Sequence, residues 1–173
     1  NWFFGESTKV SGKLATSIKK RSLANSSDLL QVTSEDVCLA NLEISNYHSE
    51  LIPCQVSLSS ISKNGRGFSL EIYGSEGSLI LKSENQKDYV HGFNLSFSNK
   101  ENKIQNLTAD SVFNFDKTWT DGRIAPVIRI QDLWAESIIN KTPIIPGLCE
   151  GLASHRICEA IKESSKSGIS IKI

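Results

Sequence analysis

Histidines and paired carboxylates are the side chains in this sequence best suited to acid–base chemistry. His48 lies in an expected hairpin turn and His155 on an expected helix, so each is placed where it could transfer a proton. Two carboxylate pairs accompany them, Glu35-Asp36 and Asp132 with Glu136, the second pair one helical turn apart. None of these groups stands in a recognised catalytic motif. We therefore interpret the histidines as surface groups and both carboxylate pairs as exposed charge.

The motifs that bind phosphates, nucleotides or metals are missing from the sequence. It contains no GxGxxG, no GxxxxGKS/T, no GxSxG and no HExxH. The segment Gly65-Arg66-Gly67 is too short to cradle a phosphate and is typical of a turn. The three histidines are scattered, without the HxH or HxxxH spacing that would seat a zinc ion. We therefore expect neither a metal site nor a catalytic residue.

The four cysteines also lack a functional spacing, because no CxxC occurs and each lies in or beside an apolar stretch. They are Cys38, Cys54, Cys149 and Cys158. We expect free, buried thiols, which suit a reducing cytosol and predict a cytoplasmic protein. The alternative is a secreted carbohydrate-binding β-protein, in which these cysteines would form disulfides.

Length and charge narrow the classes further. The 173 residues carry 19 Lys+Arg and 19 Asp+Glu, which predicts one compact domain over residues 1–173 and gives no reason to expect nucleic acid as a partner. We interpret the densest basic run, Lys19-Lys20-Arg21, as a solvated strand end. No stretch approaches the roughly 18 apolar residues that cross a bilayer, so no membrane contact is expected. Because the chain lacks Met and begins with Asn1, we interpret it as a processed product or an excised segment.

Apolar residues alternate with period two through the first half of the chain, which predicts strands. The expected strands cover residues 6–18, 37–44, 51–59, 68–73, 78–81, 90–97 and 111–115. The short polar turn at 45–48 predicts a hairpin. Gly74 and Gly77 bracket a second turn, in which we expect positive φ angles. The polar stretches 22–28 and 99–106 are expected to be surface loops.

The period changes to that of a helix near Pro126. Helices are expected over 127–138, ending before Thr142-Pro143, and over 150–166, ending at Gly168. Residues 169–173 then alternate as a last short strand. Strands followed by helices predict an α+β fold, with an antiparallel sheet that carries helices on one face.

The residues of eight short segments, and the order of these segments along the chain, say more about the family of this protein than its composition does. The segments are Phe4-Gly5-Glu6, Val10-Ser11-Gly12-Lys13, Ser34-Glu35-Asp36, residues 67–79, residues 139–143, Glu150-Gly151-Leu152, Glu159-Ala160-Ile161 and residues 164–168. Together they resemble the C-terminal domain of the Gfo/Idh/MocA family, the relatives of glucose-fructose oxidoreductase and inositol dehydrogenase. The resemblance covers essentially the whole chain.

The resemblance implies a two-part enzyme. Family members have an N-terminal Rossmann domain for NAD(H) or NADP(H). Their C-terminal α+β domain has a large, mostly antiparallel sheet that supplies part of the substrate pocket and an oligomer interface. Hydride passes between the nicotinamide and a hydroxyl-bearing carbon of a sugar, nucleotide sugar or cyclitol. By this resemblance we expect a homo-oligomer formed through the uncovered sheet face, on the premise that a wide apolar face cannot stay exposed to water without cost.

The catalytic parts of the family pattern are not in this sequence. The glycine-rich fingerprint, the Glu-Lys-Pro motif and the Asp-x-x-x-His helix are all missing. Residues 1–6 look like the end of the family's proton-handling helix and the start of the following strand. We therefore expect the Rossmann domain to be absent from this chain, which binds no cofactor, and expect the chain to be inactive alone.

Four residues are candidates for substrate contact by the same resemblance. Asn64 and Arg66 lie in the loop before the strand at 68–73, and Trp119 and Arg123 lie in the connection before the first long helix. The arginines would hold a carboxylate or phosphate, and the tryptophan would stack on a sugar ring. The competing interpretation makes Arg66 an exposed turn residue, Arg123 a surface charge and Trp119 a core anchor.

A different functional class also remains open. A free-standing, non-catalytic binding or scaffold module could have the same fold without a nucleotide-binding domain. The sequence encoded upstream of residue 1 distinguishes the two hypotheses.

Overall fold

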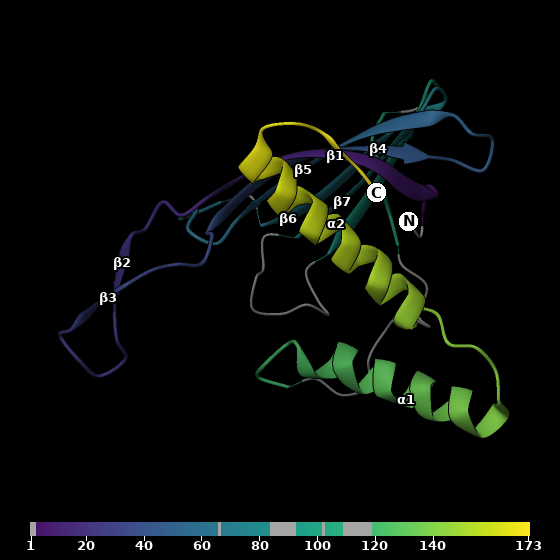
Figure 1. Ribbon diagram of the computed structural model, residues 1–173. Coiled ribbons are helices and arrows are strands. Elements are labelled where there is room, and N and C mark those ends of the chain that lie inside the picture. The colour runs from purple at the N-terminus through teal and green to yellow at the C-terminus, as the bar shows by residue number, and fades with distance from the viewer. Residues whose placement is uncertain (1–2, 66, 84–92, 102, 109–118) are drawn as a thin grey trace. The chain divides into compact units, whose positions relative to one another are not determined.

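A computed structural model describes residues 3–65, 67–83, 93–101, 103–108 and 119–173. The α+β class is confirmed, because the described residues form antiparallel sheets and two helices (Figure 1). The chain divides into two compact units. The first unit comprises Asn1–Ser62 and Ile145–Ile173, and the second unit comprises Lys63–Ile144.

The first unit is built on a four-stranded antiparallel sheet. Its strands, in the spatial order β10-β1-β4-β5, are β10 (Ile171–Lys172), β1 (Glu6–Ala15), β4 (Val37–Ser45) and β5 (Leu51–Ser59). The predicted hairpin is confirmed, since β4 and β5 pair in register from Val37 with Ser59 to Ser45 with Leu51. Alternation along β1 and β4 directs Val10 and Leu42 to one face and Lys9 and Glu43 to the other.

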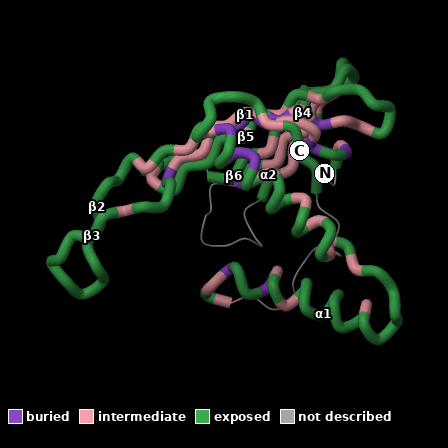
Figure 2. Tube along the Cα trace, in the orientation of Figure 1, coloured by how far each residue is buried: buried purple, intermediate pink, exposed green. Residues whose placement is uncertain are grey.

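The core of the first unit lies between this sheet and helix α2 (Leu148–Ser167). Val10 is completely buried, and Ala40, Leu42, Ile44, Ala160 and Ile161 are buried around it. Figure 2 shows the buried segments gathered on β1, β4 and the C-terminal half of α2. The helix is capped at both ends by glycines. Gly147 precedes it and donates its N–H to the Glu150 carboxylate at 2.7 Å, and Gly168, the predicted stop signal, follows it with a φ of 75°.

Two serines of α2 bind the outer edge of β1. The short strand β10 pairs only with Lys9 and Val10, so the rest of that edge needs other partners. The Gly12 N–H donates to Ser164 Oγ at 3.0 Å, and the Leu14 N–H donates to Ser165 Oγ at 2.9 Å. The Ser164 hydroxyl in turn donates to the Ile169 carbonyl at 2.7 Å. The helix therefore completes the sheet as well as covering it.

A two-stranded ribbon leaves the end of β1 and returns to β4. Its strands are β2 (Lys20–Ser22) and β3 (Leu29–Gln31), and the stretch expected to be a loop, 22–28, forms its tip. The ribbon extends away from the β1–β4–β5 sheet of its own unit (Figure 1). The strand expected over 6–18 ends earlier, at Ala15, where the ribbon begins.

Asp36 holds the base of this ribbon, and its interpretation as exposed charge is wrong. The residue is only 6% exposed, and its carboxylate accepts the Ser17 and Ile18 N–H groups at 2.7 and 2.8 Å. These two backbone hydrogen bonds lower the pKa of the Asp36 carboxyl. The carboxylate thus acts as a hydrogen-bond acceptor for the backbone just after β1 ends.

The second unit contains a separate antiparallel sheet and helix α1 (Ile124–Asn140). Its strands, in the order β6-β7-β8-β9, are β6 (Phe68–Tyr73), β7 (Gly77–Ser83), β8 (Asn94–Asn99) and β9 (Gln105–Leu107). β9 occupies part of the stretch expected to be a loop, and the strand expected over 111–115 lies outside the described residues. Neither Gly74 nor Gly77 has a positive φ. Gly77 is required instead by a close approach, because a Cβ there would lie 2.1 Å from the Ser98 carbonyl oxygen.

The strands do not form one large sheet within the described residues, since they divide into two four-stranded sheets and the β2–β3 ribbon. The face of the first sheet opposite α2 is mixed in polarity. We call the part of it formed by Lys9, Ser11, Lys13, Asn41, Glu43 and Gln55 the polar face. Apolar residues lie on the same side of the sheet, among them Leu39 and Leu51, which are 52% and 63% exposed. Along α1, whose residues are all described, Ala125 alone is buried. Neither α1 nor α2 is long and apolar enough to cross a membrane.

Gly12 sets how closely α2 approaches β1, so Gly12→Ala should destabilise the chain. A Cβ at this position would lie 2.8 Å from Ile161 Cγ2, and Ile161 is itself buried. We expect a loss of about 1–3 kcal/mol in the free energy of unfolding, measured by urea denaturation.

Gly151→Ala is the matched control for this substitution. A Cβ at Gly151, in the first turns of α2, meets no atom within 4 Å. Alanine there should be neutral or stabilise the helix by up to about 1 kcal/mol. Equal losses from the two substitutions would contradict the proposed packing role of Gly12.

Candidate functional site

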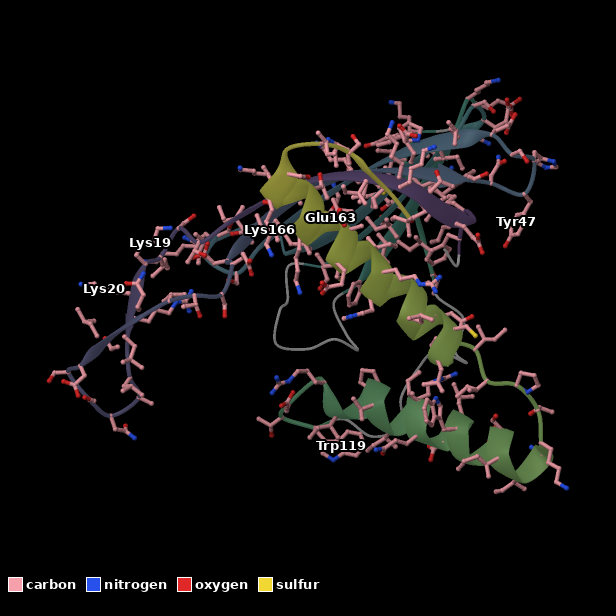
Figure 3. All side chains as sticks on the ribbon, in the orientation of Figure 1. Lys19, Lys20, Tyr47, Trp119, Glu163 and Lys166 are labelled. Atoms are coloured by element: carbon pink, nitrogen blue, oxygen red, sulfur yellow. The ribbon has the colours of Figure 1, made fainter. Side chains whose placement is uncertain are left out.

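The four residues predicted to contact substrate belong to two connections of the second unit. Asn64 is exposed in the turn before β6, with a φ of 55° that asparagine tolerates better than most residues. Arg66 lies outside the described residues. Trp119 is half-buried just before α1 and is labelled near that helix in Figure 3. Arg123 is the residue that directly precedes the helix. The structure therefore brings Trp119 and Arg123 to the start of one helix.

Arg123 forms a bidentate ion pair with Asp121, a residue that sequence reasoning did not single out. The guanidinium donates from Nη2 to Asp121 Oδ2 at 2.6 Å and from Nε to Oδ1 at 2.9 Å. The Arg123 backbone N–H also donates to Oδ1 at 3.0 Å. These bonds lower the pKa of Asp121 to about 2, so the carboxyl is ionised at any physiological pH. We call this pair the Asp121–Arg123 clasp.

The clasp changes what Arg123 offers to a ligand. A guanidinium that already holds a carboxylate attracts a second anion less strongly than an unpaired one does. A substrate carboxylate or phosphate would have to compete with Asp121 for the guanidinium. The available signal was Asp121-Gly122-Arg123 directly before a helix, where an acidic residue is typical of an N-terminus.

The first unit has a concavity of about 460 Å³ on its polar face. Side chains from three adjacent strands line it, among them Lys9, Asn41, Glu43 and Gln55. Lys9 Nζ donates to Glu43 Oε1 at 3.0 Å. Lys9 stands opposite Glu43 because the strand register shifts between Ser7 and Lys9. Such a mixture of donors and acceptors can bind hydroxyl groups, but it includes none of the four predicted residues.

The cysteines are free, as predicted, but two of them are not buried. Cys38 and Cys54 are half-buried on β4 and β5, where burial raises the pKa of the Cys38 thiol. Cys149 and Cys158 are exposed on α2, and beside Cys158 it is Ile157 that packs against the core. Within the described ranges, no group of three or more His, Cys, Asp and Glu residues could hold a metal ion.

Comparison with known proteins shows what the chain resembles as a whole. A family model described as "Oxidoreductase family, C-terminal alpha/beta domain" matches residues 1–173. An uncharacterized oxidoreductase of Synechocystis sp. is 37% identical over 165 residues, which make up 95% of this chain and 43% of that protein.

Solved structures share the fold at lower identity. An NAD binding oxidoreductase from Klebsiella pneumoniae has a TM-score of 0.68 at 19% identity, covering 97% of this chain and 46% of that one. Levoglucosan dehydrogenase, in a complex with NADH and L-sorbose, has a TM-score of 0.68 at 15% identity, with the same coverage of 97% and 46%. The chain therefore spans less than half the length of each of these relatives.

The Asp121–Arg123 clasp predicts an unusual titration. The Asp121 carboxyl should titrate with a midpoint near 2 rather than 3.8. The measurement is the NMR chemical shift of its carboxyl carbon as a function of pH. Because the folded pKa is depressed, the stabilisation by this carboxylate is present above the unfolded pKa and is lost as the pH falls toward 2. Arg123→Gln should return the midpoint toward 3.8. A midpoint that does not move in this variant would show that the guanidinium is not the cause.

Proposed function

This chain belongs to the Gfo/Idh/MocA oxidoreductases, whose C-terminal alpha/beta domain it matches over residues 1–173, and from this premise we propose its role. We propose that it is the substrate-binding and oligomerisation domain of an NAD(P)-dependent dehydrogenase that acts on a sugar, nucleotide sugar or cyclitol. The cofactor, NAD or NADP, binds to an N-terminal Rossmann domain outside this chain. The chain alone is inactive, and the whole enzyme is cytoplasmic.

The family match along the whole chain is the observation that carries this proposal. Two further facts support it. Levoglucosan dehydrogenase, which has the same fold, binds NADH and L-sorbose, a reduced dinucleotide and a sugar. This chain covers 43% of its curated relative and contains none of the motifs that bind a dinucleotide, which is the division expected of a two-domain enzyme.

The substrate side of the pocket comes from the two connections of the second unit. Asn64 and Arg66 offer an amide and a guanidinium to hydroxyl or anionic groups, and Trp119 offers a ring face to a sugar. Arg123 takes part through its clasp, which fixes the direction of the guanidinium before the ligand arrives. Because Asp121 already balances the positive charge of Arg123, this arginine suits a neutral polyol ligand better than an anionic ligand.

The same domain supports self-association through the polar face of the first sheet. Charged and amide side chains lie next to one another there, namely Lys9, Lys13, Glu43, Asn41 and Gln55. A contact on this face would combine ion pairs and hydrogen bonds between copies with the burial of Leu39 and Leu51, which lie on the same side of the sheet.

The division of labour between the two halves is directly testable. This chain alone should produce no change in NADH or NADPH fluorescence, because the proposed dinucleotide site lies in the other half. The whole gene product should bind one of these cofactors and transfer hydride with at least one member of a panel of aldoses, ketoses, nucleotide sugars and inositols. Micromolar binding of NAD(P)H by this chain alone would contradict the assignment, as would a whole gene product without a nucleotide-binding domain.

The role of Arg66 can be tested in the whole enzyme once a substrate from that panel is known. Arg66→Ala should raise KM roughly 10-fold to 100-fold, the effect of losing a charge-assisted hydrogen bond to the substrate. Lys63→Ala removes a positive charge from the same loop and is the matched control, for which KM should stay within about twofold of the unmodified enzyme. Equal effects of the two substitutions would indicate a general charge effect and refute a direct contact by Arg66.

A further inference from the structure

The β2–β3 ribbon exposes large apolar side chains without a core of its own. Every residue from Ser17 to Gln31 is exposed, as the continuous green of the ribbon in Figure 2 shows. Leu29 is 62% exposed and Leu30 is 53% exposed. A two-stranded ribbon with so little burial is only marginally stable in water. Its apolar residues therefore favour a partner.

The ribbon is nevertheless a well-formed element. At its base, Asp36 binds the Ser17 and Ile18 N–H groups, and the Val32 N–H donates to the Lys19 carbonyl at 2.8 Å. At its tip, the Leu23 N–H donates to the Asp28 carbonyl at 3.1 Å. Both ends are fixed by hydrogen bonds, so the strands between them are held in a defined register.

This register shows which backbone groups of the ribbon point outward. The pairs Lys19–Val32 and Leu23–Asp28 are hydrogen-bonded, and the pairing of Arg21 with Leu30 lies midway between them. In an antiparallel pair, hydrogen-bonded and non-hydrogen-bonded positions alternate. Arg21 with Leu30 is therefore also a hydrogen-bonded pair, whereas Leu29 and Gln31 of β3 stand at non-hydrogen-bonded positions. Leu29 and Gln31 therefore direct their N–H and C=O groups away from β2. No hydrogen bond from a described residue to these outward groups is found.

The two outer edges of the ribbon differ in charge. The β2 edge carries Lys19, Lys20 and Arg21, and Figure 3 labels the two lysines along it. Lysines on an edge strand are a common protection against pairing with another chain. The β3 edge carries Leu29, Leu30 and Gln31, with neither a charge nor a proline. Only the β3 edge of the ribbon is thus open to a further strand.

We propose that β3 pairs antiparallel with β3 of a second copy of this chain, around a two-fold axis at Leu30. In this register Leu29 faces Gln31 of the second copy, and each such pair exchanges two backbone hydrogen bonds. The two-fold axis repeats the pair, so four hydrogen bonds use all the outward groups of Leu29 and Gln31. The two Leu30 side chains meet directly across the axis, where apolar cross-strand pairs stabilise a sheet.

A second copy fits this edge better than other arrangements do. The same symmetric pairing through β2 would set Arg21 opposite Arg21, and like charges directly opposite are unfavourable. Pairing of β2 with β3 of another copy would leave one edge open at each end and build a chain of copies, whereas the two-fold pairing closes. The contact is small by the standard of stable interfaces, so the dimer formed by the ribbon alone is weak. The ribbon contact is separate from the polar face, so the proposal goes beyond the proposed self-association and does not rest on it.

Complementary charges at Leu30 provide the test. Sedimentation equilibrium up to roughly 1 mM should detect a dimer of the unmodified chain. Leu30→Lys and Leu30→Asp should each weaken dimerisation at least roughly tenfold, because like charges then meet across the axis. An equimolar mixture of the two variants should restore the dimer, since unlike charges meet. Ser22→Lys adds the same charge to β2 and should leave the dimer unchanged, and circular dichroism checks that each variant is folded.

Each contrary result has a distinct meaning. A monomeric unmodified chain would overturn both the ribbon pairing and the proposed self-association, while the oxidoreductase assignment would still be decided by hydride transfer. Dimers that persist in both Leu30 variants would overturn the ribbon pairing and leave the polar face as the contact. A mixture of the folded variants that stays monomeric would also overturn it, because the loss would then not come from charges that meet at Leu30.

Discussion

The outer edge of β1 is the point on which the first unit depends. A strand buried on one face must satisfy its backbone N–H groups at both edges, and β10 reaches only Lys9 and Val10. Ser164 and Ser165 supply acceptors for the next two outward N–H groups, and Gly12 leaves the space that lets them approach. One strand is thereby attached to β4 by a ladder and to α2 by side chains. This attachment joins the two ends of the chain into one unit and leaves residues 63–144 as a second unit between them.

The regular elements could be predicted from the sequence because their periodicity is long and clear. Both helices and the strands β1, β4, β5, β6 and β7 lie within a few residues of their predicted bounds. The ribbon and β9 were missed because three exposed residues show no alternation between buried and exposed positions. The burial of Asp36 was missed for another reason. It depends on two backbone N–H groups that lie 18 and 19 residues away in the sequence.

The candidate site depended more on resemblance than on physical pattern. Nothing in the spacing of Asn64, Arg66, Trp119 and Arg123 shows that they serve one pocket, because they belong to connections more than fifty residues apart. The clasp between Asp121 and Arg123 depends on side-chain geometry that a sequence does not give. The polar face follows directly from alternation along β1 and β4, once the buried side of Val10 and Leu42 is known.

The attachment of α2 to β1 also determines the order in which this chain can fold during synthesis. Gly12 and Ser164 are separated by 152 positions, so their hydrogen bond forms only after Ser164 has left the ribosome. The strands β1, β4 and β5 have all emerged once Ser59 is made, long before α2 begins at Leu148 and before β10 follows it. During that interval Val10, Leu42 and Ile44 remain open to water on a half-built sheet. Contacts so distant in sequence form slowly, and a sheet with an uncovered apolar face is prone to aggregate until α2 packs on it.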